Sequence, residues 1–122
     1  MRTARDGAAV SDDPLVRELL LGFIRIHILH HTAEGPVYGS EFHDELARHG
    51  YRVSYGTLYP IFHRMEKDGY IASEKRTVNG KVRRYYDISE KGRAALAEAR
   101  EKAGELYREI SPGFAPARRR RG

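Results

Sequence analysis

The chain has no cysteine among its 122 residues. Disulfide bridges, thiolate metal sites, cysteine nucleophiles and thiol redox sensing are therefore excluded. The sequence also lacks a glycine-rich phosphate loop, an activated nucleophile and a pair of carboxylates that could share a cleft. Because no catalytic constellation is present, we expect that the protein is not an enzyme and requires no cofactor.

Long apolar runs are missing as well. The apolar stretch from Leu15 to Leu29 is interrupted by Arg17, Glu18 and Arg25, and it is too short to cross a bilayer. No signal peptide is recognisable. We therefore expect a cytoplasmic protein with no membrane partner.

The length of the chain predicts a single domain. Its composition is 40% hydrophobic, which allows only a modest core, and an interface with a second subunit would add to the buried area. The net charge of +5 favours an acidic partner.

The first half of the chain predicts two helices. Asp13 can cap a helix and Pro14 suits its first position, so a helix should run from there to about His31. A second helix should span about Gly39 to Arg48 and end at the glycine that follows.

A third helix is predicted between Ser54, which can cap it, and Gly69, which can close it in the left-handed conformation. Pro60 lies inside this helix and removes one backbone hydrogen bond. Either the helix begins near Thr57 or it opens with a distorted turn.

Two predicted strands, Tyr70–Val78 and Lys81–Ile88, flank Asn79-Gly80, which is the strongest short signal for a β-hairpin. A two-residue loop sets the register: Val78 faces Lys81, Arg76 faces Arg83, Lys75 faces Arg84 and Ser73 faces Tyr86. Two pairs of cations therefore lie directly across the ribbon, which is destabilising in isolation. Phosphate oxygens would relieve that repulsion.

A short helix with outward polar and aromatic side chains, followed at once by a cationic ribbon, is the layout of a winged helix-turn-helix. The expected fold class is α+β, mostly helical, and the expected partner is double-stranded DNA. One tyrosine could instead only fill the core, and the ribbon could be a solvated charged surface. The candidate DNA-binding residues are Ser54, Tyr55, Thr57, Tyr59, Arg64, Lys67, Lys75, Arg76, Asn79, Gly80, Lys81, Arg83 and Arg84.

The first and last helices carry apolar side chains beyond the needs of one small core. The first is apolar around nearly its whole circumference. The last, about Glu90 to Ile110, has apolar residues spaced 3, 4, 3 and 4 apart, as in a coiled-coil seam. We expect both helices to dimerise the protein, through Leu15, Leu19, Phe23, Leu96, Ala99, Ala103, Leu106 and Ile110.

Three histidines, His27, His30 and His31, lie at positions i, i+3 and i+4 of the first helix. Imidazoles at this spacing can hold a divalent metal if a fourth ligand comes from elsewhere. His63 or a carboxylate of a second subunit could supply it. The alternatives are a polar patch near the helix end and a pH-sensitive patch.

The expected organisation has four parts. Residues 1–12 form a disordered leader, 13–89 the winged-helix domain, 90–110 the dimerisation helix and 111–122 a disordered basic tail. Arg118 to Arg121 in the tail could be solvated or could add non-specific affinity for DNA.

Between Leu19 and Leu96 the sequence resembles the PadR family of bacterial transcriptional regulators, in particular its smaller members with a single C-terminal helix. The chain has Tyr38-Gly39-Ser40-Glu41-Phe42 where the family usually has His-Gly-Tyr-Glu-Ile, and it has no tryptophan, which some small members use to stack flat drugs between subunits. The motifs that carry the resemblance are Gly35-Pro36 with Gly39, Ser54-x-Gly56-Thr57-Leu58-Tyr59-Pro60, Arg64-x-Glu66-x-x-Gly69-Tyr70-Ile71, Arg84-Tyr85-Tyr86 and Ser89-Glu90-Lys91-Gly92-Arg93.

The resemblance implies a homodimeric winged-helix repressor. We expect its third helix to enter the major groove of a roughly palindromic operator while the hairpin follows the adjacent backbone. An inducer should bind between subunits, near the first and last helices, and alter the spacing of the recognition helices. Two other hypotheses are a metal-responsive regulator and a winged-helix protein-interaction module that binds no DNA.

Overall fold

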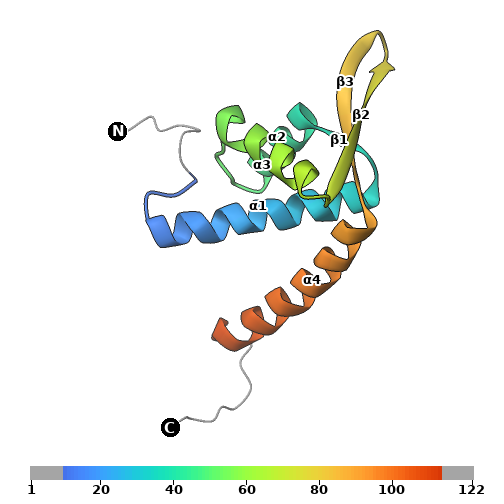
Figure 1. Cartoon of the computed structure of the whole chain (residues 1–122). Coiled ribbons are helices and arrows are strands. Elements are labelled where there is room, and N and C mark those ends of the chain that lie inside the picture. The colour runs from blue at the N-terminus through green and yellow to red at the C-terminus, as the bar shows by residue number, and fades with distance from the viewer. Residues whose placement is uncertain (1–9, 114–122) are drawn as a thin grey trace.

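The computed structural model describes residues 10–113 of the chain. Residues 1–9 and 114–122, which include most of the expected leader and the tail arginines Arg118 to Arg121, lie outside the described residues. The elements in chain order are α1 (Pro14–Glu34), β1 (Val37–Tyr38), α2 (Gly39–Arg48), α3 (Tyr55–Lys67), β2 (Ile71–Val78), β3 (Lys81–Ile88) and α4 (Glu90–Ile110) (Figure 1).

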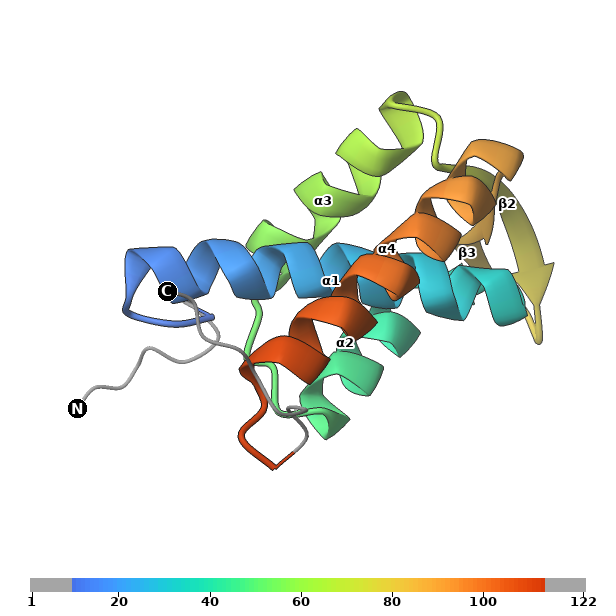
Figure 2. The ribbon, with the colours of Figure 1, turned by 90° about the horizontal axis from the view of Figure 1, so that it is seen from below.

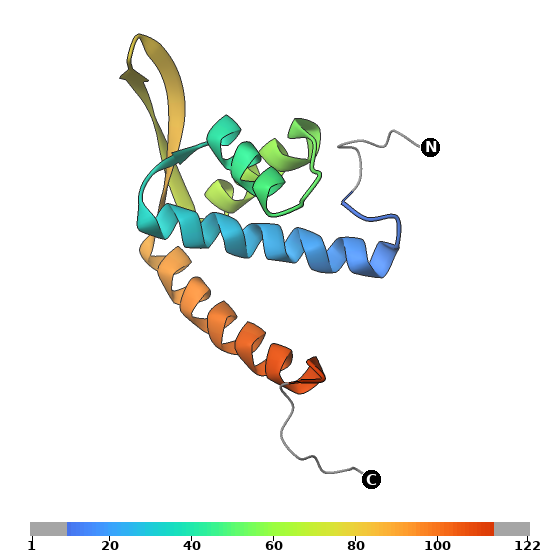
Figure 3. The same ribbon diagram turned by 180° about the vertical axis from the view of Figure 1, so that it is seen from behind.

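α1 is the central layer of the molecule. Helices α2 and α3 and the hairpin of β2 and β3 lie on one side of it, and α4 lies on the other (Figures 1 and 3). Seen from below, α4 crosses α1 obliquely (Figure 2). Within residues 10–113, no helix is both long and apolar enough to cross a membrane.

The hydrophobic core lies between α1 and the helices α2 and α3. Ile24 and Ile28 of α1 are fully buried, and the rings of Phe42 and Phe62 meet edge-to-face at 5.5 Å between centroids. Burial of an aliphatic or aromatic side chain of this size stabilises the fold by roughly 1.5–3 kcal/mol. This packing fixes the position of α3 relative to α1.

Capping residues set the helix starts as expected. The Asp13 carboxylate accepts a hydrogen bond from the Val16 amide at 2.9 Å, and the Ser54 hydroxyl accepts one from the Thr57 amide at 3.2 Å. The helix α3 therefore begins at Tyr55, not near Thr57, and includes Pro60.

Two local features differ from the expectation. The helix α1 continues one turn beyond His31 to Glu34, because only Gly35-Pro36 stops it. Thr32 is buried in this extra turn, and its hydroxyl donates a hydrogen bond to the Ile28 carbonyl at 2.7 Å. The two-residue strand β1, which was not expected, pairs with β3 and gives the sheet the order β1-β3-β2.

The hairpin has the predicted register. Val78 pairs with Lys81, as predicted. The other predicted pairs also form: Arg76 with Arg83, Lys75 with Arg84 and Ser73 with Tyr86. Asn79 and Gly80 adopt φ angles of 53° and 78°, as the tight turn requires. Four helices with a small antiparallel sheet, α+β and mostly helical, confirm the expected fold class.

Candidate nucleic-acid interface

The outward face of α3 carries a stack of aromatic rings. Tyr55 and Tyr59 lie one helical turn apart, with ring centroids 5.3 Å apart and planes 20° from parallel. The His43 ring of α2 stacks on Tyr55 at 4.2 Å. Both tyrosines are more than 40% exposed, so neither only fills the core.

The Tyr59 ring packs closely against the backbone of Gly39. A Cβ atom at Gly39 would overlap the Tyr59 ring and come within 2.9 Å of its hydroxyl oxygen. The ring therefore lies against the first residue of α2, where only glycine leaves room for it.

The other candidate DNA-binding residues of α3 differ in their exposure to solvent. Thr57 is half-buried and lies 3.3 Å from the Ser54 hydroxyl, so both side chains are engaged in the cap. Arg64 is exposed and pairs with Asp68 at 3.1 Å, one turn further along the helix. Lys67 is exposed at the C-terminal end of α3.

The wing, which we define as β2, β3 and their turn, is cationic on both faces. Successive residues of a strand alternate between faces, so Arg76 and Arg83 share one face and Lys75 and Arg84 the other. Asn79, Gly80 and Lys81 are exposed at the tip.

The chain itself offsets part of the repulsion between the facing arginines. Arg76 pairs with Glu74 at 2.8 Å and lies over the Tyr85 ring, while Arg83 lies 4.3 Å from the centre of the Tyr38 ring. Phosphate is therefore not the only group that can relieve the facing cations. Exposed ion pairs contribute little, however, and both guanidinium groups keep unused donors for a DNA backbone.

On the opposite face, Arg84 is held by a chain of polar side chains. Its guanidinium donates to the Ser73 hydroxyl at 3.0 Å, and that hydroxyl donates to the Glu66 carboxylate of α3 at 2.7 Å. The base of the wing is thus tied to the recognition helix through hydrogen bonds.

A hollow of about 190 Å³ separates α3 from the wing. Arg83 and Arg84 line it from β3, Tyr59 from α3, and Gly39 and Ser40 from the first turn of α2. The N-terminal end of a helix carries partial positive charge and free amide donors. Two arginines, tyrosine hydroxyls and a helix N-terminus line one hollow, which suits a backbone phosphate.

Sequence reasoning missed three residues of this surface. Tyr38 supports Arg83, Ser40 lines the hollow and His43 extends the tyrosine stack. They come from β1 and α2, the two elements that precede the recognition helix in the chain. Only the helix-turn-helix layout, which brings α2 across α3, could have pointed to them.

The predicted dimer residues lie mostly on exposed apolar surface. On α1, Leu15, Leu19 and Phe23 are exposed, Leu15 to 78%. On α4, Ala103, Leu106 and Ile110 are exposed and Ala99 is half-buried, whereas Leu96 is already buried in the core of its own chain.

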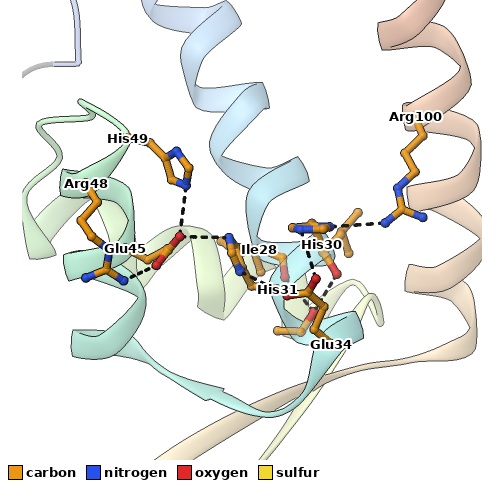
Figure 4. Close-up of polar contacts among 10 residues, drawn as sticks. Ile28, His30, His31, Glu34, Glu45, Arg48, His49 and Arg100 are labelled. Carbon is orange, nitrogen blue, oxygen red and sulfur yellow. Dashed lines mark hydrogen bonds and ion pairs between the residues drawn. The ribbon is translucent and has the colours of Figure 1, made fainter.

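The three predicted metal ligands do not converge on one point. His27 and His31 have stacked rings and meet His49 of α2, whereas His30 turns toward α4, 3.3 Å from the Arg100 guanidinium (Figure 4). His63, the suggested fourth ligand, belongs to neither of the two candidate metal-ligand groups found among residues 10–113.

Burial and the neighbouring imidazoles affect the charge of this cluster. Burial is the main cause that lowers the pKa of His27 and of His31, and the nearby histidines lower both further. A hydrogen bond from Arg48 lowers the pKa of Glu45, which lies next to His31 and His49. The lowered pKa values of His27 and His31 favour their neutral imidazole forms near the Glu45 carboxylate.

A helix-turn-helix whose second helix presents an aromatic and polar face beside a cationic wing defines a winged-helix DNA-binding protein. The model of the PadR-like family of transcriptional regulators matches residues 28–98. Transcriptional regulator Rv3488 of Mycobacterium tuberculosis is 51% identical over 98 residues, which cover 80% of this chain and 92% of the relative. The chain belongs to the PadR-like family of transcriptional regulators.

Solved structures agree with this assignment. The PadR-like transcriptional regulator of Bacillus cereus has a TM-score of 0.74 and 29% identity, and the match covers 82% of this chain and 99% of that one. A PadR family regulator from Eggerthella lenta has a TM-score of 0.69 and 30% identity, over 84% and 91% of the two chains. The family and these relatives are regulators, which confirms that the chain is not an enzyme.

Proposed function

We propose that this regulator represses transcription as a homodimer on a palindromic operator. In this proposal α3 enters the major groove and the wing follows the adjacent phosphates. The observation that carries the proposal is the hollow between α3 and the wing, where Arg83, Arg84 and the first turn of α2 surround a space suited to a phosphate. Tyr59, which lines the hollow, then lies beside that phosphate, and Tyr55 stacks on it one helical turn away.

The exposed apolar surface of α1 and α4 supports a dimer. Leu15 and Leu19 on α1 and Leu106 and Ile110 on α4 are about half-exposed or more in the single chain. Large exposed apolar patches mark interaction surfaces in soluble proteins. A two-fold dimer through these helices would present two α3 helices to matching half-sites.

The proposed effector is an apolar small molecule. A cavity of about 260 Å³ opens between α1 and α4, and its lining is mainly apolar, with Phe23, Ile26, Tyr51 and Leu96 on its walls. Arg100 lies at the same cavity and could orient an acidic or polar group of the ligand. A ligand there would act by changing the angle between α1 and α4.

A divalent metal is a second candidate effector. The specific observation in its favour is the meeting of His27 and His31 of α1 with His49, the residue that caps the C-terminal end of α2.

Selection of bound sequences from a random duplex library tests the proposal. We expect a two-fold symmetric motif with half-sites about one helical turn, roughly 10 base pairs, or a multiple of it apart. A reporter under that operator should be expressed more strongly when the regulator is deleted. Failure to enrich any duplex at low salt would favour the protein-interaction module, and higher expression with the regulator present would show an activator.

A further inference from the structure

The end of α2 brings two additional metal-ligating groups to the α1 histidines. The ligand atoms of His27, His31 and His49 all lie within 4.8 Å of one another. The Glu45 carboxylate oxygen Oε2 lies 3.1 Å from His49 Nε2 and 3.7 Å from His31 Nε2 (Figure 4). Three imidazoles thus gather between α1 and the end of α2, and the Glu45 carboxylate lies beside two of them.

We propose that His27, His31, His49 and Glu45 form a divalent-metal site that ties α1 to the C-terminal end of α2, and that an ion bound there changes operator affinity. The three imidazoles with a water molecule, or with the carboxylate as fourth ligand, would provide the tetrahedral coordination typical of zinc. The required separation between neighbouring ligand atoms is roughly 3.3 Å at zinc–nitrogen distances of 2.0–2.1 Å. The present ligand atoms lie within 4.8 Å of one another, so binding requires the side chains to rotate toward the ion.

The chemistry of the ligands favours borderline metal ions. Imidazole suits zinc, nickel, copper and cobalt, and the chain has no thiolate that could compete for them. A metal ligand must be the neutral imidazole, and burial of His27 and His31 favours that form by lowering the pKa of each ring.

Arg48 orients the carboxylate for this role. It pairs with Glu45 Oε1, while the other oxygen, Oε2, faces His49 and His31. The carboxylate can therefore bind an ion through Oε2 and keep its bond to Arg48, as outer partners of metal ligands commonly do. His49 caps α2 and His31 lies in the last turn of α1, so the negative ends of two helix dipoles also favour a cation here.

A second group of possible ligands, His30, His31 and Glu34, shares His31 with the proposed site. It is less suited to an ion, because the Glu34 side chain is 65% exposed and all three residues lie on α1 alone. The test must nevertheless separate the two groups.

An ion at the proposed site would restrain the segment that leads into α3. His49 is followed by Gly50, which has a φ angle of 89°, and residues 49–54 connect α2 to the recognition helix. A metal bond between His49 and α1 would couple the orientation of this connecting segment to the position of α1, the helix proposed to form the dimer. The effect on DNA rests on the proposed function, whereas ion binding does not.

Calorimetric titration of the full chain with Zn²⁺ tests the site. We expect one ion per chain, and His49→Gln should weaken binding at least ~10-fold, the lower end of the loss caused even by outer-shell changes. His30→Gln is the matched control and should leave binding unchanged. No saturable binding, or a loss with His30→Gln but not with His49→Gln, would overturn the site. Because His49 is exposed, its variant should fold, which circular dichroism checks, and Co²⁺ absorption provides an independent readout of tetrahedral coordination.

Operator binding measured with and without Zn²⁺ tests the regulatory part. Wild type should show a several-fold change in affinity on addition of Zn²⁺, and His49→Gln should show none. An equal response of both proteins, or no response of wild type at saturating Zn²⁺, would refute regulation through this site. If the chain binds no DNA under any condition, the proposed function fails, while calorimetry still decides whether the metal site exists.

Discussion

Gly92 offers the sharpest test of how α4 is attached to the winged helix. It lies in the first turn of α4 and is buried. A Cβ atom at this position would overlap the Tyr70 carbonyl oxygen and come within 2.7 Å of Ile88 Cγ1. The carbonyl cannot move away freely, because it accepts a hydrogen bond from the Ser89 amide at 3.0 Å.

Gly92→Ala should therefore destabilise the protein, although glycine-to-alanine changes inside helices usually stabilise. Helix propensity alone would favour alanine by about 1 kcal/mol. Overpacking against backbone costs typically 1–3 kcal/mol, and a weakened hydrogen bond costs about 1 kcal/mol more. We expect a net loss of about 1–3 kcal/mol in the free energy of unfolding.

Gly104 of the same helix is the matched control. A Cβ atom there meets only the end of the flexible Arg108 side chain, at 3.4 Å. Gly104→Ala should stabilise by roughly 0.5–1 kcal/mol. Urea denaturation of the three proteins at one chain concentration gives both values, and the reasoning is refuted if Gly92→Ala proves as stable as wild type or if both changes have the same sign.

Three further predictions concern the dimer and the DNA surface. Leu106→Asp should dissociate the proposed dimer and weaken operator binding together, because it places a charge in an apolar interface; sedimentation that shows an unchanged dimer would contradict this. Arg83→Ala and Arg84→Ala should each lower the slope of log affinity against log salt by about one unit; unchanged slopes would exclude phosphate contacts. Tyr59→Ala or Thr57→Ala should reduce preference for the selected operator over random duplex by roughly 1–3 kcal/mol if either reads a base; equal losses on both duplexes would show that they only position the protein.

Local features of this fold were predictable from sequence because local chemistry determines them. Asn79-Gly80 permits a turn of only two residues, and this turn fixes every pair of the hairpin, including Arg76 opposite Arg83. Asp13 and Ser54 fix helix starts through single hydrogen bonds to nearby amides.

Features that depend on packing between distant segments could not be predicted in this way. The strand β1 has only two residues and exists because Val37 and Tyr38 pair with Tyr86 and Tyr85, almost fifty positions later. His49 joins His27 only because α2 packs on α1, and no spacing within one helix encodes that approach. The three-histidine pattern could therefore point to this part of α1 but could not include His49, which comes from outside that helix.

His27 connects the two proposed effector sites. Its ring stacks with His31 at the metal site and also lines the cavity between α1 and α4. Tyr51 packs against the same ring, with centroids 5.4 Å apart, and lines the cavity too. An ion bound to His27 would fix the ring that a cavity ligand touches, so the two binding free energies would be coupled.

Linkage requires this coupling to be reciprocal: the factor by which an ion alters the affinity for the cavity ligand is the factor by which that ligand alters the affinity for the ion. Since α1 also carries Ile28, buried in the core that positions α3, either ligand would act on the recognition helix through one shared element.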